Sequence, residues 1–253
     1  MNYSWHWKVL LETEPGGTGT YLHYLIVGLG WTLATALAAW IIALTVGALV
    51  GTLRTTPVMW VVRLGNLYVE IFRNVPLIVQ MFLWFFVVPE LLPKALGDWI
   101  KQVPPPWGSY IPAVLCLGIF TSVRVAEQIK AGIQSLSRGQ GMAGTALGLT
   151  LPQNYRYVIL PMAFRIVLPP LTSEFMNIIK NSSVALTIGL LELTGRARAM
   201  QEFSFRVFEA FATATVIYLL TNLIVVLGMR ALEQKVRVPG FIGGAAAAPQ
   251  AGH

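Results

Sequence analysis

A long stretch without charged side chains limits what this sequence can fold into. No Asp, Glu, Lys or Arg stands between Glu14 and Arg54, and residues 24–53 are almost wholly apolar. About 20 apolar residues are enough for a helix to cross the roughly 30 Å hydrocarbon core of a bilayer. A helix satisfies its own backbone hydrogen bonds, so this segment predicts a membrane-spanning helix.

The composition extends this conclusion to the whole chain of 253 residues. Hydrophobic residues make up 55% and charged residues only 11%, whereas soluble proteins carry about 25% charged residues. Disordered chains are excluded because they combine low hydrophobicity with high charge. The net charge of +7 is scattered between apolar runs. The expected surroundings are therefore membrane lipid, and no nucleic acid partner is predicted.

Four further apolar stretches are long enough to cross a membrane. With the first, they predict an all-α integral membrane protein with five transmembrane helices. Prolines should shape two of these helices: Pro76 should bend its helix, whereas Pro169 and Pro170 are predicted to open theirs, because the first helical turn loses no hydrogen bond to proline. The predicted spans are residues 24–53, 64–88, 111–133, 169–191 and 210–229.

The distribution of basic residues predicts the orientation of this transmembrane unit, residues 24–232. The loops on one side of the membrane carry almost all of the excess of Lys and Arg over Asp and Glu, and loops rich in Lys and Arg face the cytoplasm. Segment 1–23 is therefore expected to be periplasmic. The loop 134–165 and the tail 233–253 are expected to be cytoplasmic, with the alanine-rich end of the tail disordered. Within the loop, apolar runs on either side of Thr150-Leu-Pro152 predict two short helices.

No pattern for catalysis or for a resident cofactor is found. The chain has no Gly-Lys dipeptide, so it has no phosphate-binding loop of its own. Its histidines are His6, His23 and His253, which lack metal-ligand spacing. We therefore expect no metal, no cofactor in this chain and no enzymatic activity.

Charged residues inside the predicted spans are candidates for function, because an ionised group in a bilayer needs a partner or water. Glu70 with Arg73, and Arg124 with Glu127, stand three residues apart on one helix, so the two charges within each pair could neutralise each other. Glu174 and Lys180 stand six residues apart, so they could not do so.

Lys180 is accordingly the best candidate to contact a charged solute. The amides and hydroxyls of Asn177, Asn181 and Ser182 stand beside it, and Arg73 and Glu127 complete the predicted substrate pathway. The alternative is structural: Lys180 pairs with Glu70 or Glu127 across helices, or snorkels to the interface. A separate motif, Gly47-Ala-Leu-Val-Gly51, is either a helix-packing seam or a chance pattern.

The cytoplasmic loop carries a family resemblance. Gly139-Gln140, Ala146-Leu-Gly-Leu-Thr150 and Arg156-Tyr-Val-Ile-Leu-Pro161 resemble the loop of permease subunits in binding-protein-dependent ABC importers. That loop usually reads Glu-Ala-Ala-x-x-x-Gly and then Ile-x-Leu-Pro. Here Met142-Ala143-Gly144 replaces Glu-Ala-Ala, and Gly148 keeps the glycine. Residues 70–80, 125–135 and 161–194 are similar to the polar amino-acid branch, most of all to Gram-negative glutamate/aspartate permeases.

The resemblance implies a type I ABC importer permease fold in a Gram-negative inner membrane, and import of polar or acidic amino acids, glutamate or aspartate. It implies a second permease subunit, identical or similar, a periplasmic amino-acid-binding protein, and two cytoplasmic ATPase subunits that bind ATP and Mg²⁺. The loop that docks the ATPase would use Gly139, Gln140, Ala143, Gly148, Leu160 and Pro161.

Two other classes of membrane protein are alternatives to an ABC permease. A secondary amino-acid transporter driven by an ion gradient would also have apolar spans and intramembrane charges, but would normally show internal repeats. A membrane enzyme would need a nucleophile, a metal or an acid/base cluster, and no such set is seen.

Overall fold

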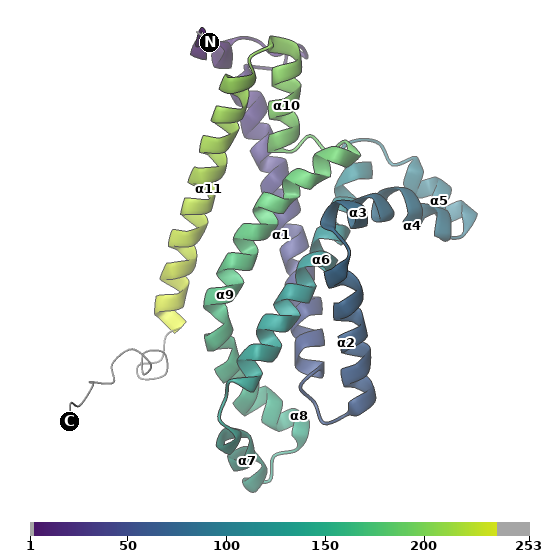
Figure 1. Ribbon diagram of the computed structural model, residues 1–253, viewed down its shortest axis with the longest axis vertical. Helices are drawn as coiled ribbons and strands as arrows, with labels where there is room; N and C mark the ends of the chain where they lie inside the picture. Colours follow the sequence, from purple (N-terminus) through teal and green to yellow (C-terminus); the bar gives the residue numbers. More distant parts are fainter. Residues whose placement is uncertain (1–2, 237–253) are drawn as a thin grey trace, which may run out of the picture.

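The computed structural model describes residues 3–236, and this part of the chain is built from helices (Figure 1). The α-helices are α1 Tyr21–Leu53, α2 Met59–Asn74, α3 Leu77–Phe82, α4 Val88–Leu91, α5 Lys94–Lys101, α6 Trp107–Gln134, α7 Arg138–Ala146, α8 Leu151–Asn154, α9 Leu160–Asn181, α10 Leu193–Ser204 and α11 Val207–Val236. Short 3₁₀ helices span Trp7–Leu11 and Ser182–Ile188, and π-helical turns span Leu83–Val87 and Tyr155–Ile159.

The long helices lie side by side, with the short ones at the two ends of the bundle (Figure 1). Helices α7 and α8 form one end, while the N-terminal segment, α10 and α3 to α5 lie towards the other. Within the described residues, four helices are long and apolar enough to cross a membrane, and the bent pair α2 with α3–α4 would make a fifth. Apolar side chains of α11, such as Leu219, Leu223 and Ile224, are exposed, as expected for a surface that faces lipid or a partner subunit.

Helices α1 and α6 approach each other closely along a seam of glycines. A Cβ at Gly47 would lie 2.6 Å from the side chain of Val125 and 2.7 Å from the carbonyl oxygen of Ser122. At Gly51 it would lie 2.7 Å from the carbonyl oxygen of Ala126. All three distances are shorter than van der Waals contact, so of the two alternatives the helix-packing seam is the one found, and it is the α1–α6 interface.

Gly47→Leu should disrupt this interface. Backbone atoms of α6 cannot move aside as a side chain can, so we expect a loss of at least about 1–3 kcal/mol in stability. Gly30→Leu is the matched control, because nothing lies within 4 Å of a Cβ at this exposed position of the same helix. Thermal unfolding of the two purified variants should show a lowered melting temperature for Gly47→Leu alone. Equal melting temperatures would contradict the seam.

The chain breaks where one continuous span was predicted over 64–88. Helix α2 ends at Asn74, and α3 begins at Leu77 after a bend of 100° at Val75-Pro76. Proline has no N–H and forces the preceding residue out of helical conformation, which leaves carbonyls of α2 without helical partners. The buried Gln80 amide donates to Phe72 O of α2 at 2.8 Å and to Val75 O, in the break itself, at 2.9 Å.

Pro169 and Pro170 lie inside α9, so the prediction that they open the fourth span is wrong. The α-helix begins earlier, at Leu160, and follows directly on the π-helical turn Tyr155–Ile159. Its α-helical part ends at Asn181 and continues as the 3₁₀ helix. Leu160 and Pro161, which were predicted to lie in the cytoplasmic loop, are therefore the first turn of this long helix.

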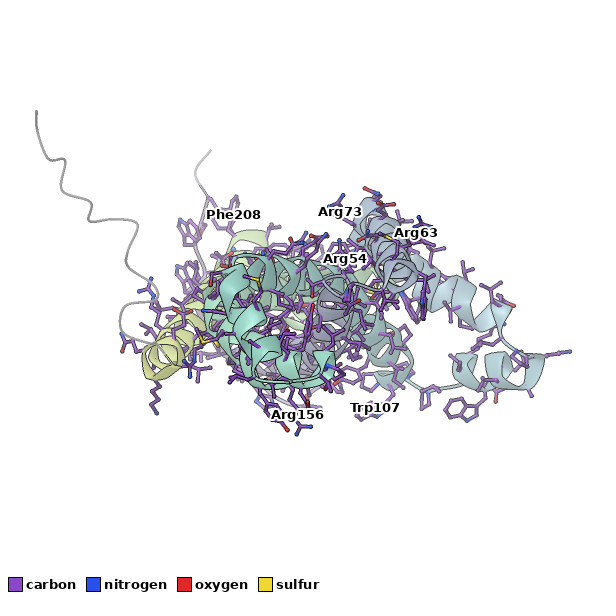
Figure 2. All side chains as sticks on the ribbon, turned by 90° about the horizontal axis from the view of Figure 1, so that it is seen from below. Arg54, Arg63, Arg73, Trp107, Arg156 and Phe208 are labelled. Carbon is purple, nitrogen blue, oxygen red and sulfur yellow. The ribbon has the colours of Figure 1, made fainter. Side chains whose placement is uncertain are left out.

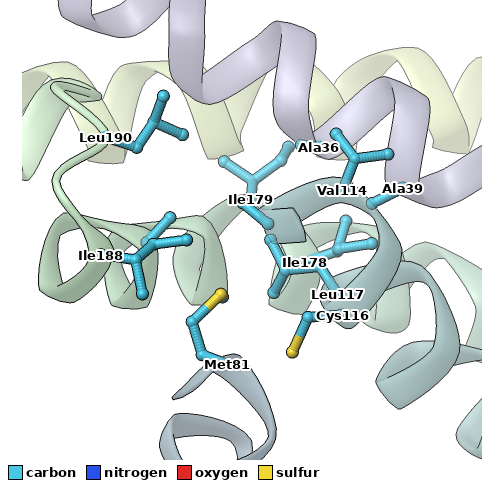
Figure 3. Packing of buried hydrophobic residues seen from close by; sticks show 12 residues of the cluster. Ala36, Ala39, Met81, Val114, Cys116, Leu117, Ile178, Ile179, Ile188 and Leu190 are labelled. Atoms are coloured by element: carbon cyan, nitrogen blue, oxygen red, sulfur yellow. The ribbon is translucent and has the colours of Figure 1, made fainter. Parts of the chain in front are cut away.

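The largest cluster of buried apolar residues joins α3, α6 and α9 to α1 (Figure 3). Met81 of α3 packs with Cys116 and Leu117 of α6 and with Ile178 and Ile179 of α9. All five are fully buried. The bend at Pro76 thus directs α3 into the bundle, where it packs against the last turns of α9.

The N-terminal segment is fixed to the start of α11. Tyr3 donates a hydrogen bond from its hydroxyl to the Glu209 carboxylate, and its ring packs edge-on against Phe208. Before α1, Glu14 accepts hydrogen bonds from the hydroxyl and the backbone N–H of Thr18 and from Gly16. These bonds hold the pKa of the Glu14 carboxyl below its usual range.

Candidate functional sites

The loop between α6 and α9 is a compact helical hairpin, which we call the coupling hairpin (residues 138–159). The predicted break near Thr150 is present, because α7 ends at Ala146 and α8 begins at Leu151. The prediction is wrong in its detail: Leu151 and Pro152 lie within α8, and the second helix is not a separate short one, because it continues through the π-helical turn into α9. Helix α7 ends in a Schellman motif: Gly148, at φ +79°, donates to Thr145 O, and Leu149 donates to Gly144 O. Thr150 and Gln153 then form a capping box at the start of α8.

Asn154 holds the two short helices together. Its buried side chain donates from Nδ2 to Gly141 O of α7 at 2.8 Å. A Cβ at Gly144 would lie only 2.4 Å from Asn154 Oδ1. A larger residue at position 144 would therefore displace the Asn154 side chain, which carries the hydrogen bond between α7 and α8.

The hairpin is also connected to two long helices. The π-helical turn Tyr155–Ile159 runs directly into α9, so no flexible joint separates them. Tyr155 donates from its hydroxyl to Thr55 O, just beyond the end of α1, at 2.8 Å. A displacement of the hairpin would thus be passed to α9 through the chain and to α1 through Tyr155.

The far side of the hairpin is open and partly apolar. Leu147 is 82% exposed and Met142 is 66% exposed. Of the predicted docking residues, Gly139, Ala143 and Gly148 are exposed on the hairpin. Gln140 is half-buried and faces a cavity beneath α7. An isolated loop would not keep such an apolar surface in water, so this side suits a protein partner.

Gly144→Ala should therefore displace the Asn154 side chain, which holds α8 to α7, although it raises helix propensity. Gly30→Ala makes the same chemical change in α1, where nothing in the described chain lies within 4 Å of the Cβ. We expect ATP-dependent uptake by reconstituted vesicles to fall at least about tenfold for Gly144→Ala, and to stay within about twofold of wild type for Gly30→Ala. Equal uptake by both variants would show that the hairpin packing is not needed.

The charged side chains within the bundle form ion pairs between helices. Arg54, just after α1, binds Glu127 of α6, with 2.9 Å between Nη2 and Oε1. Arg124 of α6 lies 3.7 Å from Glu174 of α9 and stacks over Phe120. The predicted neutralisation of Arg124 by Glu127 is therefore wrong, because each residue has a partner on another segment.

Lys180 and Asn177 share one accessible face near the end of α9, and Asn181 follows directly. Ser182 is fully buried and donates to Ile179 O, so its hydroxyl is not on this face. Among the described residues of this one subunit, Lys180 makes no ion pair. The Lys180 face is the second candidate site.

Arg73 and Glu127 lie elsewhere in the bundle. Arg73 is exposed at the edge of the molecule, in the last turn of α2, whereas Arg54 lies nearer the centre (Figure 2). Glu127 pairs with Arg54 towards the hairpin end, which excludes it as the partner of Lys180 in this subunit. Within one subunit the predicted pathway residues are therefore not gathered in one place.

The sequence analysis missed a buried carboxylate, that of Glu192. It caps α10 by accepting hydrogen bonds from Thr194 N and Gly195 N, and it accepts two more from the hydroxyls of Tyr218 and Thr32. Its side chain is fully buried. Glu192 therefore joins α10 to α1 and α11 at the end of the bundle opposite the hairpin. The only sequence signal was an acidic residue just before a helix start.

Comparison with known proteins gives a consistent answer. Residues 43–238 match the family described as "Binding-protein-dependent transport system inner membrane component". The glutamate/aspartate import permease protein GltJ of Escherichia coli K12 is 48% identical over 96% of this chain and 100% of its own length. The glutamine transport system permease protein GlnP of the same organism is 30% identical over 85% of this chain and 93% of its own.

Solved structures agree with the fold. A crystal structure of an amino acid ABC transporter with histidines superposes with a TM-score of 0.71 at 29% identity, over 85% of this chain and 95% of the other. An inward-facing methionine transporter, MetNI, gives 0.66 at 16% identity over 86% and 96% of the two chains, which shows the shared fold alone.

These matches support the ABC transporter permease fold and give no support to a secondary transporter or an enzyme. The family model covers more than half of the chain, and the relatives match nearly end to end. The chain therefore belongs to the family of inner membrane components of binding-protein-dependent transport systems, as a transport subunit of an ABC importer.

Proposed function

We propose that this chain is the permease subunit of an importer that moves acidic amino acids, glutamate and aspartate, from a periplasmic binding protein into the cytoplasm. The observation that carries the proposal is the 48% identity to a glutamate/aspartate import permease over 96% of this chain and the whole of that protein. Identity to the glutamine permease is only 30%, which favours acidic over neutral substrates.

The proposed assembly has two permease subunits, identical or similar, two cytoplasmic ATPase subunits that bind ATP and Mg²⁺, and a periplasmic binding protein. The N-terminus is periplasmic and the C-terminus cytoplasmic in this arrangement. The basic loops support the orientation, because they lie at the coupling-hairpin end of the bundle. The coupling hairpin is the docking element for the ATPase, with Gly139, Ala143 and Gly148 on its exposed side.

Helix α9 would transmit the movement of the ATPase to the solute path. Residues 151–188 form one nearly continuous helical element that starts in the coupling hairpin and carries Lys180 near its other end. A shift of the hairpin would therefore move the Lys180 face, where Asn177 and Asn181 add hydrogen-bonding groups. Arg73 and Glu127 would belong to the path only if a second subunit brings them together. Lys180 contributes a positive charge for the substrate carboxylate.

Uptake of labelled amino acids by reconstituted vesicles tests this function. The vesicles would contain this chain with its partner permease, the ATPase subunits and the binding protein, and glutamate, aspartate and glutamine would be compared. We expect glutamate and aspartate to accumulate only when ATP, ATPase and binding protein are all present. Uptake driven by an ion gradient without the ATPase would contradict the proposal, and so would a preference for glutamine.

A further inference from the structure

Two adjoining cavities lie between the short helices α4 and α5 and the beginning of α6, at the end of the bundle opposite the coupling hairpin (Figure 1). The smaller has a volume of about 170 Å³ and the larger a volume of about 420 Å³. Both are lined by Pro89, Ile100, Val103, Gly108 and Pro112. Because the cavities share these residues, one elongated ligand could occupy both of them.

The smaller cavity is apolar. Its other lining residues are Trp84, Val88, Trp99, Trp107, Ile111 and Leu115. Among these described side chains only the indole N–H groups are polar, and an ordered water needs two to four polar partners. If the cavity stayed empty, its walls would lose part of their van der Waals contacts. A flexible apolar chain therefore suits this cavity better than water does.

This cavity follows an exposed apolar stripe of α6. Trp107, Ile111 and Leu115 recur every four residues and are exposed, whereas the three residues between Ile111 and Leu115 are buried. At a rise of 1.5 Å per residue the stripe is about 12 Å long, which is less than half of the roughly 30 Å hydrocarbon core of a bilayer. Trp107 lies at the edge of the molecule (Figure 2). The stripe therefore has the length and the exposure to hold an acyl chain within one leaflet.

Two tryptophans lie where the cavity opens to the surface. Trp99 is 62% exposed and Trp107 is 52% exposed. The Trp107 ring packs edge-on against Trp31 of α1, with 5.8 Å between the ring centres, which fixes this wall to the bundle. Tryptophan is enriched at membrane–water interfaces, where its ring contacts apolar groups and its N–H reaches water. The opening thus suits the depth of lipid headgroups, in the periplasmic leaflet if the proposed orientation holds.

The larger cavity adds charged groups to this site. Glu90 of α4 and Lys101 of α5 line it, and they form an ion pair with 2.6 Å between Glu90 Oε1 and Lys101 Nζ. The side chains are 66% and 43% exposed, so each can also bind a further group. They are the charged residues in the described lining, and together they have no net charge. A headgroup with both a phosphate and an ammonium group would meet an opposite charge for each.

We propose that the two cavities bind one zwitterionic phospholipid of the bilayer. An acyl chain would lie along Trp107, Ile111 and Leu115, and the headgroup would place its phosphate at Lys101 and its ammonium at Glu90. The bound lipid would fix α4 and α5 to α6, close to the point where α3 enters the bundle. The proposal does not depend on which amino acid the importer carries.

Native mass spectrometry of the complete importer tests this site. The importer would be stripped of lipid in detergent and then incubated with an equal mixture of dioleoyl phosphatidylethanolamine and dioleoyl phosphatidylglycerol. We expect one phospholipid to be retained per copy of this chain, and the retained lipid to be mainly phosphatidylethanolamine, because an anionic headgroup finds no net positive charge here. Absence of retained lipid, or equal retention of the two lipids, would overturn the proposal.

Two matched pairs of variants locate the lipid. Leu115→Trp fills the smaller cavity and should weaken retention at least about tenfold. Leu219→Trp makes the same change at an exposed position of α11 and should retain lipid as wild type does. Trp99→Ala removes one wall and should also weaken retention, whereas Trp60→Ala, at an exposed position of α2, should not.

The competing occupant of this surface is the second permease subunit. In that case Leu115→Trp would dissociate the permease pair, and Trp99→Ala would retain lipid as wild type does. This combination would overturn the proposal, and so would wild-type retention by an assembled Leu115→Trp importer. If Leu115→Trp does not assemble, loss of the retained lipid from assembled Trp99→Ala, with Trp60→Ala unchanged, still supports the lipid site.

Discussion

Arginine in place of Gly148 is expected to abolish the stimulation of ATP hydrolysis by binding protein and substrate, while the chain still inserts into the membrane. Gly148 ends α7 with φ +79°, a conformation that costs an L-residue about 1–2 kcal/mol. The position is exposed on the proposed docking side, so the long cation would also stand between the hairpin and the ATPase. ATPase assays of the reconstituted complex and co-purification of the ATPase measure both effects.

The crowding caused by Gly148→Arg would involve the ATPase rather than this chain. Nothing in the described chain lies within 4 Å of a Cβ at Gly148, so the crowding must come from the partner. Gly148→Asn is the informative control, because asparagine tolerates positive φ and adds little volume. It should keep at least about half of the stimulated activity. Normal transport by Gly148→Arg, with the ATPase still bound, would show that this surface does not dock the ATPase.

Features with a local physical cause could be predicted from the sequence. Uninterrupted apolar runs located α1 and α11, because one long helix needs no information from the rest of the chain. Thr150-Leu-Pro152 indicated a break in the loop, which lies just before Leu151, because the capping box of α8 is formed by neighbouring residues. The spacing of Gly47 and Gly51 allowed a packing seam, but its partner α6 does not follow from these residues.

Features that depend on distant residues could not be predicted in this way. The pairing of Glu127 with Arg54, rather than with Arg124 on its own helix, requires α1 and α6 to lie side by side. Pro76 signalled a bend, but the angle of 100° follows from the packing of Met81 against α6 and α9. Glu192 gave only a weak capping signal, since its other partners lie on α1 and α11.

Lys180→Met should reduce uptake of glutamate and aspartate at least about tenfold while assembly and melting temperature stay close to wild type. Lys180 is accessible near the end of α9 and makes no ion pair in the described part of this subunit, so its removal leaves no buried carboxylate unpaired. Loss of one charge-assisted hydrogen bond to a substrate carboxylate corresponds to about 1.4 kcal/mol, or tenfold in affinity.

Two further variants separate a solute contact from a general effect of charge. Lys94→Met makes the same change at an exposed position of α5, and it should leave uptake unchanged. Lys180→Arg keeps the charge and should retain more activity than Lys180→Met. The structural alternative was an ion pair of Lys180 with Glu70 or Glu127 across helices, and neither pair is present in the described part of this subunit. An ion pair with a carboxylate of a second subunit would make a different prediction: Lys180→Met would lower the melting temperature or dissociate the permease pair. An assembled Lys180→Met importer that takes up glutamate with unchanged affinity would exclude Lys180 from the solute path, because no other property of this side chain would then connect it to transport.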